Sequence, residues 1–335
     1  MKKPLSIFCI IVLMLFTLSS CSQANKPASI FLYVGDIESS AYEDRIIENI
    51  QFDCAVSSNT CELTIFHFSD LTEGLTLETL LAEKPDSLIV RPATIEEADE
   101  ILTLAKNNNI PVIFYGISPS ADAFAGYQNC WYIQFEPFLQ GEVAGSIVAT
   151  AYKNGVVTDV DKDLLLDIIL LYDSQTQERT ASSFIRSIED TGLFTSPLDY
   201  STESEQAFQN VILEQESTIE AIFCGNDAIL TSTVQFLTEH EVFSEEALPF
   251  IVFGIGNSPE SLNYVRQGYV LGVAFENPST ISNAIFHFAM NTAFQRNITE
   301  GTSYRLEMSR ILSLPIEAVT IENVENALLS YAMLE

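Results

Sequence analysis

Apolar, β-rich runs alternate with amphipathic stretches along most of this 335-residue chain, and that alternation constrains the fold more than any other feature. Runs rich in Val, Ile, Phe and Tyr predict strands, and the segments between them carry apolar residues at helical spacing. A strand–helix–strand order of this kind is typical of a parallel sheet covered by helices on both faces. In the first half we expect strands at 30–34, 62–68, 87–90 and 111–115, and helices at 42–50, 77–81 and 96–107.

The same rhythm restarts in the second half of the chain, with no long linker before it. The chain length also suggests about two domains, since a single domain usually holds ~100–200 residues. The sequence therefore predicts an α/β protein with two lobes, each built on a parallel sheet. In this half we expect helices at 139–153, 179–191, 205–216, 228–240 and 258–267, and strands at 164–172, 219–224, 249–254 and 270–275.

Glycines and polar residues follow the carboxyl ends of the expected strands. In open α/β sheets, ligands bind beyond these ends. Helix capping and tight turning also favour the same residue types, so both interpretations stay open. The candidates are Gly35-Asp36, Arg91-Pro92, Gly116, Asn226-Asp227, Gly256-Asn257 and Glu276-Asn277.

The N-terminus has the features of an export signal over residues 1–20. Lys2 and Lys3 precede an apolar run at 5–16, which is shorter than the ~20 residues needed to span a bilayer. The Leu-Ser-Ser-Cys sequence that ends at Cys21 resembles the bacterial lipobox, whose cysteine is acylated and becomes the first mature residue. This resemblance implies an exported, periplasmic protein held at the membrane surface by a lipid, with a polar tether over 21–28. A plain signal peptide with an incidental cysteine is the alternative.

The charge of the chain excludes one class of partner. With 46 acidic and 15 basic residues, the formal net charge is −31. Such a chain repels the phosphate backbone of nucleic acids, so we expect no nucleic-acid partner. The sequence also holds no GxSxG, HExxH or P-loop motif, and its three histidines lie in unrelated segments. We therefore do not expect an enzyme.

The cysteines leave a choice between a disulfide and free thiols. Export would permit disulfides, which form in oxidising compartments. Cys54 and Cys61 bracket a short polar loop and could close it, whereas buried free thiols fit the sequence equally well.

Several segments in the second half of the chain, and one in the first, carry a shared family pattern. Residues 219–228 read Ile-Glu-Ala-Ile-Phe-Cys-Gly-Asn-Asp-Ala, and residues 253–262 read Phe-Gly-Ile-Gly-Asn-Ser-Pro-Glu-Ser-Leu. The segments 109–115 and 268–273 and the dipeptide Leu314-Pro315 add to them. Together they resemble the type I periplasmic sugar-binding proteins, most closely the galactose/glucose-binding branch.

This resemblance implies two Rossmann-like lobes joined by a three-strand hinge. We expect an N-terminal lobe of 29–134 plus 277–311, and a C-terminal lobe of 135–276 plus 312–335. The implied function is that of a monomeric solute-binding lipoprotein of an ABC importer, which delivers a small polar solute such as a sugar to a permease. The alternative is a degenerate member of the fold that acts as a sensory or interaction lipoprotein without transport.

An acidic segment precedes the strand expected at 164–172. Asp159, Asp161 and Asp163 occupy positions 1, 3 and 5 of an EF-hand-like loop, and Asp167 occupies position 9. Hard cations such as Ca²⁺ need several oxygen ligands of this kind. Leu164 stands where such loops usually have Gly, so an acidic turn before a strand is the alternative.

The family resemblance completes this candidate metal site. Its galactose/glucose-binding branch takes a bidentate carboxylate from a distant strand, and the matching residue here is Glu220. Leu165 would contribute its backbone carbonyl. The resemblance thus implies a structural Ca²⁺ ion held by Asp159, Asp161, Asp163, Leu165, Asp167 and Glu220.

The resemblance to the family is weaker among the residues that would contact the solute. Tyr42, Arg179 and Asn226 match the family's stacking aromatic, arginine and amide in type. Ser40, Gly116, Gly256 and Glu276 replace its polar contact residues. The candidate substitutes are Asp36, Glu38, Arg91, Asn257 and Asn277, of which Arg91 could favour an acidic ligand. The expected solute-binding residues are Tyr42, Arg91, Arg179, Asn226, Asn257 and Glu276.

Overall fold

The structure is a computed structural model, and the residues it describes are 26–57, 60–157, 162–163, 165–172, 175–201, 219–240 and 250–332. Of residues 175, 176 and 198–201 only the backbone is described. The expected export signal at 1–20, the expected lipidation site Cys21 and the expected helix at 205–216 lie outside these ranges. None of the helices within the described ranges is long and apolar enough to cross a membrane.

The N-terminal lobe is built on a six-stranded sheet in the order β11-β5-β4-β3-β1-β2, in which all neighbours are parallel. Its strands are β1 (Ala28–Val34), β2 (Cys61–His67), β3 (Ser87–Arg91), β4 (Val112–Tyr115), β5 (Cys130–Phe135) and β11 (Ile311–Leu314). Its helices are α2 (Ala41–Val56), α3 (Leu77–Leu81), α4 (Ile95–Asn108), α5 (Ala121–Ala125) and α11 (Pro278–Ala293), with a short 3₁₀ helix at Phe68–Asp70.

The C-terminal lobe repeats this plan in a second sheet of order β12-β10-β9-β8-β6-β7, where only the β12–β10 pair is antiparallel. Its strands are β6 (Leu165–Tyr172), β7 (Phe194–Ser201), β8 (Ala221–Cys224), β9 (Ile251–Ile255), β10 (Gly272–Phe275) and β12 (Glu317–Thr320). Its helices are α6 (Pro137–Lys153), α7 (Gln175–Glu189), α9 (Asp227–Glu239), α10 (Pro259–Gln267) and α12 (Val324–Leu329).

Each sheet has helices on both faces, as the strand–helix alternation predicts. In the N-terminal lobe, α2 and α11 pack on one face, and α3 and α4 on the other. In the C-terminal lobe, α6 and α7 cover one face, and α9, α10 and α12 the other. Every residue of the inner strands β4, β8 and β10 is buried, because these strands are covered from both sides. The predicted fold class is therefore confirmed.

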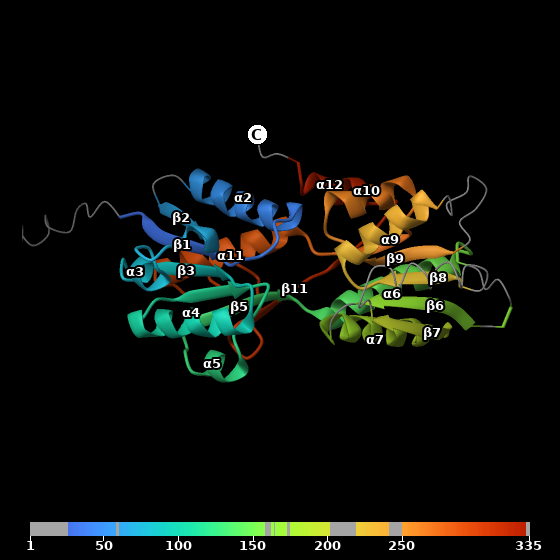
Figure 1. Cartoon of the computed structure of the whole chain (residues 1–335), viewed down its shortest axis with the longest axis horizontal. Helices are drawn as coiled ribbons and strands as arrows, with labels where there is room; N and C mark the ends of the chain where they lie inside the picture. Colours follow the sequence, from blue (N-terminus) through green and yellow to red (C-terminus); the bar gives the residue numbers. More distant parts are fainter. Residues whose placement is uncertain are drawn as a thin grey trace, which may run out of the picture.

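The chain passes between the lobes three times, and Figure 1 shows the lobes side by side along the long axis of the molecule. The crossings follow β5, β10 and β11. The first two lie within two residues of the expected boundaries. The third lies after Leu314 and not after residue 311, because Ile311 to Leu314 pair with β5 and belong to the first sheet. Leu312 and Leu314 are buried in the N-terminal core, which fixes that strand in place.

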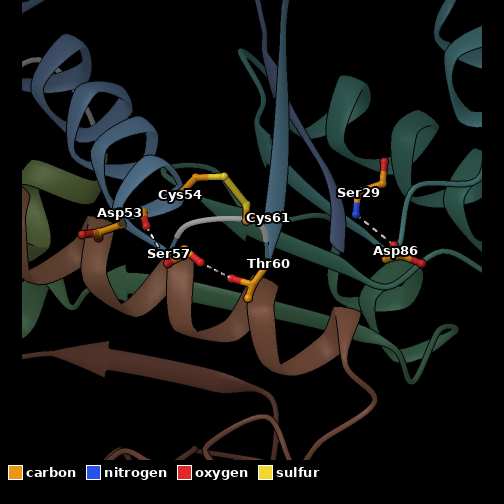
Figure 2. The surroundings of a disulfide bond; sticks show 7 residues. All are labelled: Ser29, Asp53, Cys54, Ser57, Thr60, Cys61 and Asp86. Carbon is orange, nitrogen blue, oxygen red and sulfur yellow. Dashed lines mark hydrogen bonds between the residues drawn. A yellow bond between two sulfur atoms is a disulfide. The ribbon is translucent and has the colours of Figure 1, made fainter. Parts of the chain in front are cut away.

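A disulfide links Cys54, near the end of α2, to Cys61 at the start of β2, with their Cα atoms 5.5 Å apart (Figure 2). Of the two alternatives that the sequence left open, the structure forms the disulfide. Two hydrogen bonds also hold this turn, from Ser57 Oγ to the Asp53 carbonyl and from Thr60 Oγ1 to the Ser57 carbonyl. Cys130 and Cys224 are buried free thiols, and burial raises the pKa of each to about 12.

Candidate functional site

A cavity of about 430 Å³ lies where the two lobes face each other. Its walls come from the segment after β1, the first turn of α2, the ends of β3 and β4, and β5 of the N-terminal lobe. The C-terminal lobe adds Asn257 after β9 and Glu276 after β10. The cavity therefore lies at the carboxyl ends of parallel strands, where open α/β sheets bind their ligands.

The first turn of α2 carries two of the cavity side chains, Tyr42 and Glu43. Ser40 starts this helix, since its hydroxyl accepts a hydrogen bond from the Glu43 backbone N–H at 3.2 Å. Serine is a favoured residue at this position for that reason. Ser40, which replaces a contact residue of the family, thus caps α2. The cap holds the first turn of the helix, from which Tyr42 and Glu43 reach the cavity.

Arg91, the last residue of β3, forms an ion pair with Glu43 whose Nε–Oε1 distance is 2.8 Å. The side chains of both residues are largely buried, at 17% and 13% exposure. Arg91 Nη1 also donates to the Pro92 carbonyl at 2.8 Å. The guanidinium group is therefore held on two sides, and Glu43 neutralises its charge.

Gly116 gives Arg91 the space that it occupies. A Cβ atom at Gly116 would lie 2.8 Å from Arg91 Cδ, and the φ of +74° at this position also favours glycine. Gly116, which replaces a contact residue of the family, thus leaves the space that the side chain of Arg91 on the neighbouring strand fills.

Glu276 connects the two lobes inside the cavity. Its Oε1 accepts from Gln140 Nε2 at 2.5 Å, its Oε2 from Asn257 Nδ2 at 3.4 Å, and it also accepts a hydrogen bond from the Tyr42 hydroxyl. Burial, helped by the negative charge of Glu43, raises the pKa of Glu276 to about 7, although its three hydrogen bonds act in the opposite direction. This carboxyl group therefore changes its charge near neutral pH.

The loop that carries Asn257 is held by the start of α9. Asp227 Oδ1 accepts from the backbone N–H groups of Asn257 and Ser258 at 2.7 and 2.9 Å. The neighbouring Asn226 caps α9, because its Oδ1 accepts from the Ile229 backbone N–H at 2.7 Å. Both residues of the Asn-Asp turn thus support the local backbone.

The structure brings four of the six expected solute-binding residues together in the cavity: Tyr42, Arg91, Asn257 and Glu276. Asn226 caps a helix and is not part of the cavity wall. Arg179 is exposed on α7 and lines a different hollow beside the start of α6. The expectations did not include Glu43, Tyr115 and Tyr132, which also line the cavity. For Glu43, its position beside Tyr42 was the available signal.

The expected metal residues are described only in part, because Asp159 and Asp161 lie outside the described residues. β6 and β8 are neighbours, so Asp167 and Glu220 lie side by side: Glu220 Oε2 accepts from the Asp167 backbone N–H at 3.2 Å. Glu220 is 5% exposed. Asp163 Oδ1 accepts from the Leu165 backbone N–H at 2.8 Å.

Carboxylate and carbonyl oxygens are the donors that Ca²⁺ prefers. Within the described ranges alone, no group of three or more acidic, histidine or cysteine side chains is arranged to hold a metal ion.

Residues 37–295 match the family defined by the periplasmic binding protein domain. The chain belongs to this family. The resemblance predicted from the sequence is thereby confirmed. The chain is also similar to the D-galactose/methyl-galactoside binding periplasmic protein MglB of Haemophilus influenzae. That protein is 23% identical over 258 residues, which cover 74% of this chain and 76% of the relative.

Solved structures of solute-binding proteins share the family fold. One is an ABC transporter periplasmic solute-binding protein of Actinobacillus succinogenes with bound D-allose, which aligns with a TM-score of 0.68 and 17% identity over 89% of this chain and 99% of that one. Another is an ABC transporter solute-binding protein of Bacillus halodurans with bound myo-inositol, with a TM-score of 0.65 and 16% identity over 92% of this chain and 100% of that one.

Proposed function

We propose that this protein is the extracytoplasmic solute-binding component of an ABC importer, and that it clamps a monosaccharide or a related polyol between its lobes. The observation that carries the proposal is the cavity between the lobes, which both lobes line with hydrogen-bonding side chains. Its volume of about 430 Å³ lies in the range of small-molecule sites. The relative and the solved structures described above are named for, or contain, D-galactose, D-allose and myo-inositol.

The charges in the cavity favour a neutral solute over an acidic one. Arg91, the cation that could have attracted an anion, is already paired with Glu43. Glu276 adds a second carboxyl group, so an acidic solute would meet repulsion. The partly buried Tyr42 and Tyr132 supply aromatic rings, which pack well on the C–H faces of a sugar. The proposal includes no catalytic residue.

The proposal includes export, a lipid anchor at Cys21 and an ABC permease as partner of the monomeric protein. The N-terminal sequence supports the export signal and the lipobox. The disulfide between Cys54 and Cys61 agrees with an oxidising compartment outside the cytoplasm.

We also propose a structural Ca²⁺ ion that ties the loop before β6 to β8. Asp159, Asp161, Asp163 and Asp167, the Leu165 carbonyl and Glu220 would hold it. The adjacency of Asp167 and Glu220 across the β6–β8 pair supports this ligand set. The test adds Ca²⁺ to protein that a chelator has stripped of metal. We expect the melting temperature of the wild type to rise and that of the double variant Asp161→Ala, Glu220→Ala to stay unchanged. Equal responses of the two proteins would contradict the site.

The solute role is tested by calorimetric titration of the purified chain with D-galactose, D-allose and myo-inositol. We expect saturable binding of at least one of them. If none binds and no other small polar solute raises the melting temperature, the sensory or interaction role replaces the transport role.

A further inference from the structure

Two polar atoms at the cavity lack partners inside the protein. Among the described residues, the buried side-chain atoms without a hydrogen bond are Glu43 Oε2, the Tyr115 hydroxyl and Thr195 Oγ1. The first two belong to residues that line the same cavity, whereas Thr195 lies on β7 in the C-terminal lobe. Buried polar groups in native proteins are rarely left unpaired, because each such group costs stability. Two such atoms in one cavity therefore indicate a ligand that pairs with them.

Both side chains are held in position by their neighbours. Glu43 uses its other oxygen for the 2.8 Å bond from Arg91 Nε, and Arg91 is itself held by the Pro92 carbonyl. Tyr115 ends β4, is 1% exposed and packs in the core formed between the sheet, α2 and α11. The two polar atoms are thus fixed before a ligand arrives, which reduces the entropy that binding must overcome.

The chemistry of the pair selects the ligand group. A carboxylate only accepts hydrogen bonds, so the partner of Glu43 Oε2 must be a donor. An anionic group of the ligand cannot donate and is repelled. An ammonium group can donate, but the ion pair with Arg91 already neutralises Glu43, so the pair offers a cation no net negative charge. A neutral hydroxyl group meets neither obstacle, and an adjacent hydroxyl can pair with Tyr115.

We propose that Glu43 and Tyr115 determine specificity in the N-terminal half of the cavity, where they bind two hydroxyl groups of a neutral polyol while Arg91 positions Glu43. This inference rests on the proposed solute-binding function. It assigns recognition to the start of α2 and the end of β4, next to the positions where Ser40 and Gly116 replace the family's contact residues.

A direct bond between Tyr115 and Glu43 is the competing explanation. Glu43 and Arg91 lie close enough to Tyr115 for their charges to act on its pKa, in opposite directions. If the two groups paired with each other in solution, removing the hydroxyl would destabilise the empty protein. If the hydroxyl awaits a ligand, its removal leaves the empty protein as stable as before or more stable.

The test uses the full chain, the variants Glu43→Gln and Tyr115→Phe, and calorimetric titration with D-galactose, D-allose and myo-inositol. The matched controls are Glu260→Gln and Tyr264→Phe on α10. The Tyr264 hydroxyl donates to the Glu260 carboxylate at 2.9 Å, and this pair lies away from the cavity. D-Galacturonate and D-glucosamine test the charge argument.

We expect Glu43→Gln to weaken binding by about 10- to 100-fold and Tyr115→Phe by about 3- to 10-fold, as for the loss of a charged and a neutral hydrogen bond. The melting temperature of empty Tyr115→Phe should equal or exceed that of the wild type, and the controls should bind like the wild type.

Unchanged affinity in both variants, or a lower melting temperature of empty Tyr115→Phe with unchanged affinity, would overturn this inference and leave the solute-binding role standing. Tighter binding of D-galacturonate or D-glucosamine than of the neutral solutes would overturn it as well. Failure of the wild type to bind any neutral polyol would overturn both proposals.

Discussion

At the scale of single residues, Glu276 gives the clearest dependence on pH. Its pKa rises from an ordinary value of 4.5 to about 7 in the folded protein, chiefly because it is buried. A carboxyl group with a raised pKa binds more protons in the folded state, so its contribution to stability is full below pH 4.5 and is lost as the pH rises to about 7. The ligand-free protein should therefore lose stability over this window.

Glu276→Gln removes this titration and keeps a side chain of the same shape. We expect the melting temperature of the ligand-free variant to change less than that of the wild type between about pH 5 and pH 8. At pH 8 the variant should be the more stable protein, by less than about 3 kcal/mol, since each pKa unit corresponds to ~1.4 kcal/mol. The exposed Glu317, which accepts from Asn277 at 2.9 Å in the same region, provides the control variant Glu317→Gln. Parallel pH curves for wild type and Glu276→Gln would contradict the assignment.

The cavity residues that the sequence predicted share one property: they follow the end of a recognisable strand or resemble a family position. Arg91 is the last residue of β3, and Asn257 and Glu276 follow β9 and β10 within two residues, so the general rule for open sheets located them. Tyr115 was missed because it is the last apolar-looking residue of a buried strand. Its function depends on an unpaired hydroxyl, which a pattern of hydrophobicity does not reveal. Asn226 was expected in the cavity but caps α9. Asparagine is favoured both in helix caps and in binding sites, so its type alone does not separate the two roles.

At the scale of elements, the Cys54–Cys61 disulfide joins α2 to β2, and so it stabilises the helix whose first turn forms part of the cavity. The cysteines are separated by seven positions, so the closed loop is short. The loss of loop entropy in the unfolded chain predicts a stabilisation of about 2.5 kcal/mol.

The double variant Cys54→Ser, Cys61→Ser should lower the free energy of unfolding in urea by that amount. A reducing agent should lower the stability of the wild type to a similar extent and leave the double variant unaffected, because Cys130 and Cys224 are already free thiols. An equally stable double variant would show that the turn needs no covalent link, since Ser57 and Thr60 already hold it by hydrogen bonds.

Among the elements, strong periodicity was easier to interpret than nearly continuous hydrophobicity. α4 was expected at 96–107 and spans Ile95–Asn108, because it is amphipathic and ends at Asn109, whose φ is +58°. The 16-residue helix α11 was not expected. It is buried against the first sheet along much of its surface, so it lacks the polar face that reveals a surface helix. The expected boundary after residue 311 assigned the last three residues of β11 to the C-terminal lobe, since only the pairing of the whole strand with β5 reveals where the chain crosses.

At the scale of the whole molecule, residues 330–332 after α12 contact both lobes and so join them in addition to the three backbone crossings. Tyr331 packs on the core of the C-terminal lobe, and its hydroxyl donates to the Asn257 carbonyl. From the other lobe, Arg45 of α2 donates through Nε to the Ser330 carbonyl at 2.9 Å and through Nη2 to the Ala332 carbonyl. In the view of Figure 1, α12 lies between α2 and α10.

Arg45 is 6% exposed, so its two bonds to carbonyl groups are shielded from water and should favour the arrangement in which the lobes lie close together. Arg45→Gln keeps some polarity but loses the charged, forked donor. We expect the ligand-free variant to populate more open arrangements, with a larger radius of gyration in X-ray scattering and solute binding weakened by about 3- to 30-fold. Glu48→Gln is the matched control, because Glu48 pairs with Arg45 within α2 and is 61% exposed. If Arg45→Gln and Glu48→Gln both scatter and bind like the wild type, the contact does not restrain the lobes, and the opening motion depends on the three crossings alone.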